Sequence, residues 1–242
     1  MALRGLSSSP RVVLFDALGT LVGLEPPAPR LRAELARRFG LAVTQAQAEE
    51  VIGAEIAYYR AHLSQGRDAA SLAELRARCA AVVSRELERI LDSEVPTGPE
   101  MVDSLLASLS FSAFADARPT LGALHALGLR LVVVSNWDVS LGAVLERLGL
   151  SEWLDGVVTS AAVGVAKPDP EIFQRGLATV GAGANEAVHV GDSLREDVDG
   201  ARAAGIEPVL LSRHEAADPL KEPETLTVRT LVELPPLLGG AH

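Results

Sequence analysis

Six side chains that can do nucleophilic or ionic chemistry stand at or just beyond the ends of apolar segments. They are Asp16, Ser135, Asn136, Lys167, Asp192 and Asp197. An aspartate can attack an electrophile and form a covalent intermediate, which splits one difficult displacement into two easier ones. A lysine can stabilise negative charge on the nucleophile and on the transferred group, and a serine hydroxyl can add a hydrogen bond. The chain contains only two lysines, Lys167 and Lys221, so few side chains could supply such an amine.

The segments that carry these residues are typical of buried strands alternating with helices. Apolar runs bounded by turn residues predict strands over 11–15, 130–135, 156–160, 187–191 and 207–212, with a weaker one over 225–229. The runs are almost continuously apolar, as in strands buried on both faces. Helical patterns separate them from about residue 111 onward, so we expect an α/β fold with a Rossmann-like, doubly wound parallel sheet. Sites in such sheets form at the carboxyl ends of the strands.

Residues 22–110 interrupt this alternation. The segment opens with the proline-rich sequence EPPAPR, continues as four helical patterns and contains no convincing strand. We therefore expect an all-helical cap domain at 22–110, inserted into a core domain built from 1–21 and 111–242. One cap helix places four side chains close together, and these could either select a substrate or belong to the cap's own core and surface. They are Tyr58, Tyr59, Arg60 and His62.

The composition of the chain argues against some binding partners and some cellular locations. A formal net charge of -10 over 242 residues argues against binding to nucleic acid, because no basic stripe is available to displace counterions. No apolar run approaches the roughly 18 residues that span a bilayer, and the first ten residues are too polar for a signal peptide. We expect a cytoplasmic protein without membrane contact. Cys79 is the only cysteine, which excludes an intrachain disulfide. The sequence leaves the oligomeric state open.

Four segments in order resemble the motifs of the haloacid dehalogenase superfamily of hydrolases. They are LFDALGTL, VVVSNWD, AKPDPEIF and HVGDSLREDVDGARAAG. The helical insert after the first segment is similar to the cap of the subgroup that contains 2-haloacid dehalogenases and many small-molecule phosphatases. The resemblance implies a hydrolase acting on a small molecule, with Asp16 as the nucleophile. It places Thr20, Ser135, Asn136 and Lys167 in the catalytic set.

The same resemblance implies a Mg²⁺ site. Asp16, Asp192 and the backbone carbonyl of Leu18 form an all-oxygen set of the kind that suits Mg²⁺. Asp197 belongs to this acidic set and would orient the metal's waters or Lys167.

Leu18 departs from the phosphatase pattern. Phosphatases of the superfamily carry a second aspartate two residues after the nucleophile, which protonates the leaving oxygen and later activates water. General acid–base help of this kind contributes roughly 10²- to 10⁴-fold in rate. Leucine cannot transfer a proton, although its backbone carbonyl can still bind a metal. The sequence thus retains the metal-binding residues of a phosphatase but lacks the aspartate that would transfer the proton.

Three interpretations stay open. The first is a Mg²⁺-dependent phosphoryl hydrolase that forms an aspartyl phosphate at Asp16, either on substrates with good leaving groups or with a cap histidine or tyrosine as proton donor. The second is a metal-independent 2-haloacid dehalogenase, whose own motif is similar at Ser135-Asn136 but lacks the acidic pattern around Asp192. The third is a catalytically weak binding module. Phosphonoacetaldehyde hydrolases are excluded because residues 22–110 contain no lysine for a Schiff base, and P-type ATPases because nothing here spans a membrane.

Overall fold

The computed structural model describes residues 10–213 and 225–239. The chain divides into two compact units. One comprises the described residues up to Gly23 together with those from Ala113 onward, and the other is Leu24–Ser112.

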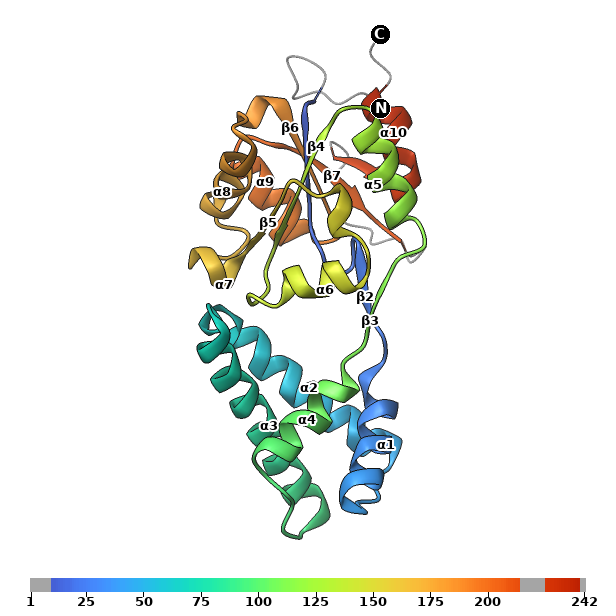
Figure 1. Ribbon diagram of the computed structural model, residues 1–242, viewed down its shortest axis with the longest axis vertical. Helices are drawn as coiled ribbons and strands as arrows, with labels where there is room; N and C mark the ends of the chain where they lie inside the picture. The colour runs from blue at the N-terminus through green and yellow to red at the C-terminus, as the bar shows by residue number, and fades with distance from the viewer. Residues whose placement is uncertain (1–9, 214–224, 240–242) are drawn as a thin grey trace. The chain divides into compact units, whose positions relative to one another are not determined.

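A six-stranded sheet forms the centre of the first unit (Figure 1). Its strands are β1 (Val12–Phe15), β4 (Arg130–Ser135), β5 (Gly156–Thr159), β6 (Ala187–Gly191), β7 (Glu207–Leu211) and β8 (Leu226–Val228). Their order is β5-β4-β1-β6-β7-β8, and every neighbouring pair is parallel. All six predicted strands and the doubly wound parallel fold are therefore confirmed. The register pairs Phe15 with Val133 on one side and with Val190 on the other, so the ends of β1, β4 and β6 lie together.

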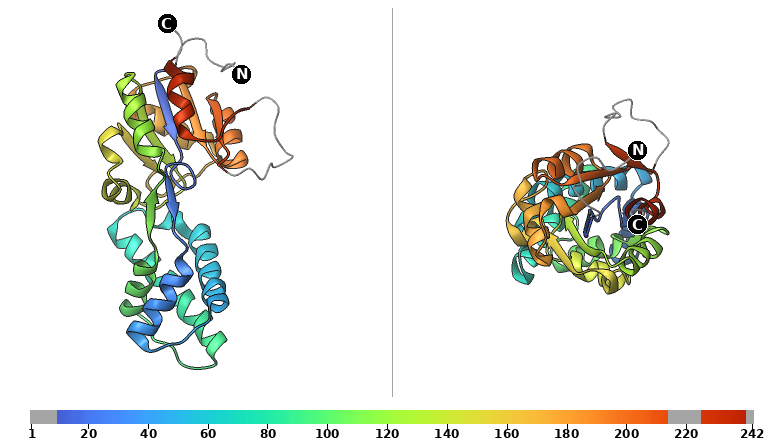
Figure 2. Two further views of the ribbon diagram at one scale, coloured as in Figure 1. Left: turned by 90° about the vertical axis from the view of Figure 1, so that its right-hand side faces the viewer. Right: turned by 90° about the horizontal axis from the view of Figure 1, so that it is seen from above.

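Helices cover both faces of this sheet. On one face lie α8 (Pro170–Val180) and α9 (Gly200–Ala203), whose apolar side chains share a core cluster with Leu14 of β1 and with Val132 and Val134 of β4. On the other face lies α5 (Ala117–Ala126), with α10 (Leu234–Gly239) beside it in Figure 2. The connections contain α6 (Leu141–Arg147), α7 (Ser160–Val163) and the short helical turns η2 (Ser151–Trp153), η3 (Ala184–Glu186), η4 (Leu194–Asp199) and η5 (Leu231–Glu233).

A second, two-stranded sheet was not expected. Strands β2 (Val22–Leu24) and β3 (Phe111–Ala113) pair with each other, so the prediction that 22–110 contains no strand is wrong at its start. The chain passes from one unit to the other within these strands, after residues 23 and 112. Each strand has only three residues, and these mix buried, partly buried and exposed positions, which is too little for a clear hydrophobic pattern.

The second unit is a four-helix unit. Its helices are α1 (Pro27–Phe39), α2 (Gln45–His62), α3 (Ala69–Leu91) and α4 (Pro99–Ser108), with the short turn η1 (Leu63–Gln65) after α2. Reciprocal side-chain caps start α2 at Thr44 and α3 at Asp68, which satisfies backbone N–H groups that a helix start leaves free. Tyr58 and Tyr59 pack against the core of this unit. In the described part of the chain, no helix is long and apolar enough to cross a membrane.

One ionisable group is buried in the core of the helical unit. Glu55 on α2 is 4% exposed; burial raises its pKa, and a hydrogen bond with Cys79 opposes this rise. Glu55→Gln should increase the free energy of unfolding by about 1 kcal/mol at neutral pH, because the amide buries no charge. Since the pKa is higher in the folded state, wild-type stability falls as pH rises from the ordinary glutamate value through the raised one. The gain in free energy of unfolding from Glu55→Gln should therefore disappear at a pH below the ordinary pKa of glutamate.

Urea unfolding at acidic and neutral pH tests this expectation. Glu49→Gln, on the exposed side of the same helix, is the matched control and should change stability by less than about 0.5 kcal/mol. An equal gain from Glu55→Gln at both pH values would contradict the assignment of a buried, charged carboxylate.

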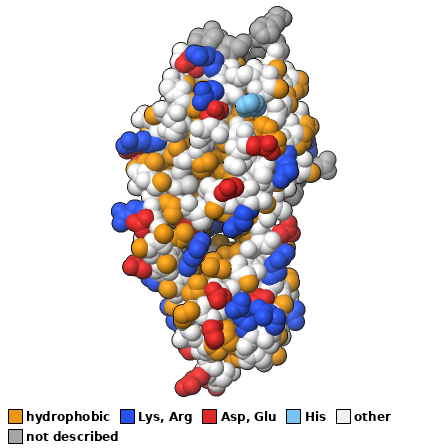
Figure 3. Space-filling view, in the orientation of Figure 1, with side chains coloured by type: hydrophobic (Ala, Val, Ile, Leu, Met, Phe, Trp, Pro, Cys, Tyr) orange, Lys and Arg blue, Asp and Glu red, His pale blue; other side chains and the backbone are white. Residues whose placement is uncertain are grey.

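The surface carries charges of both signs. On the face drawn in Figure 3, acidic and basic side chains are interspersed and do not form a basic stripe. This distribution agrees with the expectation from net charge, and the exclusion of nucleic acid remains a prediction.

Candidate active site

A tight turn follows β1 and presents Asp16. The backbone N–H of Asp16 donates to the carbonyl of Val190 (2.9 Å), which fixes the aspartate at the junction of β1 and β6. Three N–H groups, from residues 20, 21 and 22, point back to the carbonyl of Ala17. Gly19 has a φ of 89°, and a Cβ atom there would overlap the Asp192 carboxylate. Glycine is therefore needed at this position both for the turn and for the close approach of Asp192.

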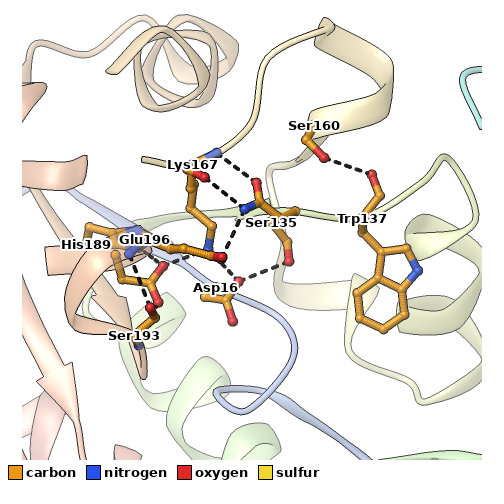
Figure 4. A network of polar contacts seen from close by, with 10 residues as sticks. Asp16, Ser135, Trp137, Ser160, Lys167, His189, Ser193 and Glu196 are labelled. Atoms are coloured by element: carbon orange, nitrogen blue, oxygen red, sulfur yellow. Dashed lines mark hydrogen bonds and ion pairs between the residues drawn. The ribbon is translucent and has the colours of Figure 1, made fainter. Parts of the chain in front are cut away.

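Asp16 lies in a buried cluster of polar side chains (Figure 4). Its Oδ1 accepts hydrogen bonds from Lys167 Nζ (2.6 Å) and from Ser135 Oγ (3.0 Å). Lys167 is 4% exposed and Asp16 is 6% exposed. Both bonds that the described residues make to this carboxylate go to Oδ1, so Oδ2 is the oxygen available for attack or for a cation.

Asp197 anchors the other side of Lys167. Its Oδ1 accepts from Lys167 Nζ (2.6 Å) and contacts His189 Nε2 (2.9 Å), and its Oδ2 accepts from the backbone N–H of Ser193 (3.0 Å). The widened helical turn η4 brings Asp197 back toward the sheet, and such π-turns are frequent at functional sites. Gly191 leaves the space that Asp197 fills, since a Cβ there would overlap its carboxylate. Asp197 thus contacts Lys167 directly, and its predicted role in orienting the lysine remains a prediction.

Asn136 holds the backbone of Lys167. Its Oδ1 accepts from the Lys167 N–H (2.7 Å), while its Nδ2 donates to the Lys167 carbonyl (3.0 Å) and to Glu196 Oε2 (3.0 Å). The amide group is therefore fully used in fixing the loop that carries the lysine. These bonds hold the backbone of Lys167 in place, and the catalytic role predicted for Asn136 remains a prediction.

The charges of the cluster influence one another strongly. Burial raises the pKa of Asp16 to about 6, although the positive charge of Lys167 opposes this rise. Burial alone would raise the pKa of Asp197, but Lys167 and the bond to His189 outweigh it and hold that pKa below its usual range. Burial would likewise lower the pKa of Lys167, but Asp16 and Asp197 raise it instead. At neutral pH the site therefore holds a protonated lysine between ionised carboxylates.

The donor set fits a divalent cation. Asp16, Asp192 and Asp197 each offer one carboxylate oxygen, and these oxygens lie within 4.8 Å of one another. Asp192 is exposed, whereas the other two are buried. Three carboxylates face a single lysine, so a cation of charge two would neutralise the cluster. Mg²⁺ prefers oxygen ligands and binds few protein groups at once, which suits this set.

Two predicted residues have less direct support. The Thr20 hydroxyl is buried and has no hydrogen-bond partner among the described residues, so no bond joins it to Asp16. The Leu18 side chain is 37% exposed, and its backbone forms an isolated bridge with Val22. Their catalytic and metal-binding roles remain predictions.

Arg213 stabilises the same turn from outside the predicted motifs. Its guanidinium donates to the carbonyls of Gly19 (3.2 Å) and Thr20 (2.6 Å), pairs with both oxygens of Asp116, and lies 3.9 Å from the ring centre of Phe114. The turn that follows the nucleophile is thereby tied to the segment after β3. Sequence analysis missed this interaction because Arg213 is one arginine among twenty.

His189 and Glu196 were also missed as site residues. His189 points inward from the middle of a predicted strand and is fully buried, with its ring edge-on to Phe173. A histidine inside an otherwise apolar run was a usable signal, because a buried polar side chain needs a partner. Glu196 directly precedes Asp197, and its contact with Asn136 depends on the shape of η4.

Comparisons with known proteins identify the family of this chain. Residues 10–205 match the family of haloacid dehalogenase-like hydrolases, and the chain belongs to that family. The mouse protein named haloacid dehalogenase-like hydrolase domain-containing protein 3 is 30% identical over 86% of this chain and 84% of its own length. Ribulose-1,5-bisphosphate 5-phosphatase of Halopiger xanaduensis is 40% identical over 43% of this chain and 44% of its own.

A solved structure matches over nearly the whole length. The crystal structure of a HAD phosphatase from Thermococcus onnurineus has a TM-score of 0.62 at 26% identity, covering 95% of this chain and 98% of that one. The predicted superfamily is confirmed, and the chain is a hydrolase of that family.

Proposed function

We propose that the protein is a Mg²⁺-dependent phosphoryl hydrolase that acts on a small molecule through an aspartyl phosphate at Asp16. The observation that carries this proposal is the acidic cluster at Asp16. Asp16 and Asp197 both bind the ammonium group of Lys167, and Asp192 offers a carboxylate oxygen within 4.8 Å of theirs. A site for a dianionic phosphate needs more positive charge than one lysine supplies. The names of the relatives, which include a sugar-bisphosphate phosphatase, support the same reaction class.

Each residue of the cluster has a role in this reaction. Oδ2 of Asp16 attacks the phosphorus, and Lys167, held by Asp197 and by the backbone bonds from Asn136, stabilises the charge that develops on the transferred group. Ser135 holds Asp16 in position through its bond to Oδ1. Asp16, Asp192 and the Leu18 carbonyl would hold Mg²⁺, and Asp197 would orient its waters. The bound cation would supply charge neutralisation at the phosphoryl oxygens.

Two features favour this function over dehalogenation. A metal-free dehalogenase has no use for the acidic cluster, which costs stability when no cation compensates it. The amide of Asn136 is bound on both sides to the Lys167 loop, so it is not free for a halide. The helical residues 22–110 are proposed as the cap that selects the substrate, with Tyr58, Tyr59, Arg60 and His62 as candidate contacts.

Phosphate release from para-nitrophenyl phosphate and acetyl phosphate tests the proposal. We expect turnover with Mg²⁺, loss of turnover with excess EDTA, and recovery when Mg²⁺ exceeds the chelator. Mg²⁺ alone should also raise the melting temperature, because a ligand of the folded state stabilises it, and Asp192→Asn should weaken that shift. Undiminished phosphate release in EDTA would contradict the metal assignment. Halide release from 2-chloropropionate in EDTA, without phosphate release, would favour the dehalogenase instead.

A further inference from the structure

Among the described residues of the core unit, no free proton donor lies beside the proposed nucleophile Asp16. Leu18, two residues after Asp16, has an exposed hydrocarbon side chain. In the part of the chain that the structure describes, the two side chains that donate to Asp16 are Ser135 and Lys167. Lys167 uses its ammonium group on two carboxylates at 2.6 Å, and Asp197 is bound by three partners.

The remaining carboxylates near the site are also engaged. Asp192 is required for the cation under the proposed function, and Glu196 is bound to Asn136. Within residues 10–23, 113–213 and 225–239, every ionisable side chain in contact with the Asp16 carboxylate thus has another task. None of them is a neutral acid placed to protonate a leaving oxygen.

Resting on the proposed function, we propose that the substrates are phosphates whose leaving group departs as a stable anion, namely acyl phosphates and aryl phosphates, and that the phosphorylated Asp16 is long-lived. In the first step, Asp16 Oδ2 forms a bond to phosphorus while the phosphorus–oxygen bond of the substrate breaks. The electron pair leaves with the substrate oxygen, and no proton is transferred. The rate of this step therefore depends directly on the stability of the leaving anion.

The second step, hydrolysis of the aspartyl phosphate, lacks a general base because position 18 is a leucine. A water molecule attacks phosphorus, the bond to Asp16 breaks, and its electron pair returns to the carboxylate. The proton of the attacking water has to pass to solvent, because Leu18 cannot accept it. General base help at such a step contributes about 10²- to 10⁴-fold. Hydrolysis of the aspartyl phosphate should then be slower than its formation from a good substrate.

A series of substrates measured in Mg²⁺ buffer tests both steps. We would compare 2,4-dinitrophenyl, 4-nitrophenyl, phenyl and glycerol phosphates. We expect kcat/KM to fall by about 10²-fold or more from the nitrophenyl to the alkyl ester, while kcat stays the same for the two nitrophenyl esters because they share one slow step. Rapid mixing should release close to one nitrophenolate per active site in a burst. Acid-quenched protein should carry one phosphoryl group by mass spectrometry.

Leu18→Asp is the informative variant and Leu18→Asn its matched control. The aspartate should raise kcat/KM for glycerol phosphate by about 10²-fold and leave kcat/KM for 2,4-dinitrophenyl phosphate nearly unchanged. It should also remove the burst of nitrophenolate. Asparagine has the same shape as aspartate but cannot transfer a proton. Leu18→Asn should therefore show neither the increase in kcat/KM for glycerol phosphate nor the loss of the burst. A wild-type protein that hydrolyses alkyl and aryl phosphates equally well, without a burst, would overturn the inference by showing that another group supplies the proton. Absence of turnover and of phosphoprotein with every substrate would instead refute the proposed function itself.

Discussion

Asp16→Asn is expected to lower kcat/KM for 4-nitrophenyl phosphate by about 10⁴-fold or more, since removal of a covalent nucleophile leaves only binding and electrostatic effects. The amide keeps the shape of the side chain and can still accept a hydrogen bond from Ser135 or Lys167 at its oxygen. The loss would thus come from chemistry and not from collapse of the cluster. Steady-state kinetics and mass spectrometry of the acid-quenched protein measure it, and the variant should carry no phosphoryl group.

The stability of the same variant provides an independent control. Asp16 is buried, and the negative charges of Asp197 and Asp192 raise its pKa together with burial, so removing its charge relieves repulsion. We expect Asp16→Asn to melt no lower than the wild type without Mg²⁺. Asp199→Asn, an exposed aspartate in the same unit, should retain full activity. Phosphate turnover above a few per cent in Asp16→Asn would show that another residue is the nucleophile.

The sheet could be predicted because its signal lies in contiguous residues. Segments such as VVLF and RLVVVS are apolar at almost every position, and all six strands were found in this way. The parallel order then places the ends of β1, β4 and β6 together, which is how Asp16 and Ser135 could be assigned to one site without coordinates. Strands β2 and β3 could not be predicted, because a strand of three residues is too short to show a hydrophobic periodicity.

The contacts within the site could be predicted only in part. The residue types of Asp16, Lys167 and Asp192 identified the chemistry, but the link from His189 through Asp197 to Lys167 depends on η4. The sequence around Asp197 predicts an ordinary helix, whereas the π-turn changes which side chains point at the sheet. The bonds of Arg213 to the Gly19–Thr20 turn join residues almost two hundred positions apart, and no local pattern indicates such a pair.

The balance of charge connects stability with catalysis in this cluster. Lys167 is buried between Asp16 and Asp197, so it serves as their counter-ion as well as being the proposed catalytic cation. Removing one partner of a buried ion pair leaves an uncompensated charge and costs about 3–5 kcal/mol. A loss of activity in a lysine variant would therefore be ambiguous unless folding is measured separately.

Lys167→Met is expected to lower kcat/KM by about 10²- to 10³-fold, the usual effect of removing one group that stabilises transition-state charge, and to destabilise the protein strongly. Combining it with Asp197→Asn removes one of the two buried negative charges that Lys167 neutralises and should recover part of the stability. Activity should stay low in this double variant, because the phosphoryl group still lacks its cation.

Urea unfolding and kinetics of the two single variants and the double variant separate the two roles of the lysine. Asp197→Asn alone keeps Lys167 next to Asp16 and should lose less activity than Lys167→Met. Recovery of activity together with stability in the double variant would mean that Lys167 only compensates buried charge. Recovery of stability without activity would identify the ammonium group as part of the reaction.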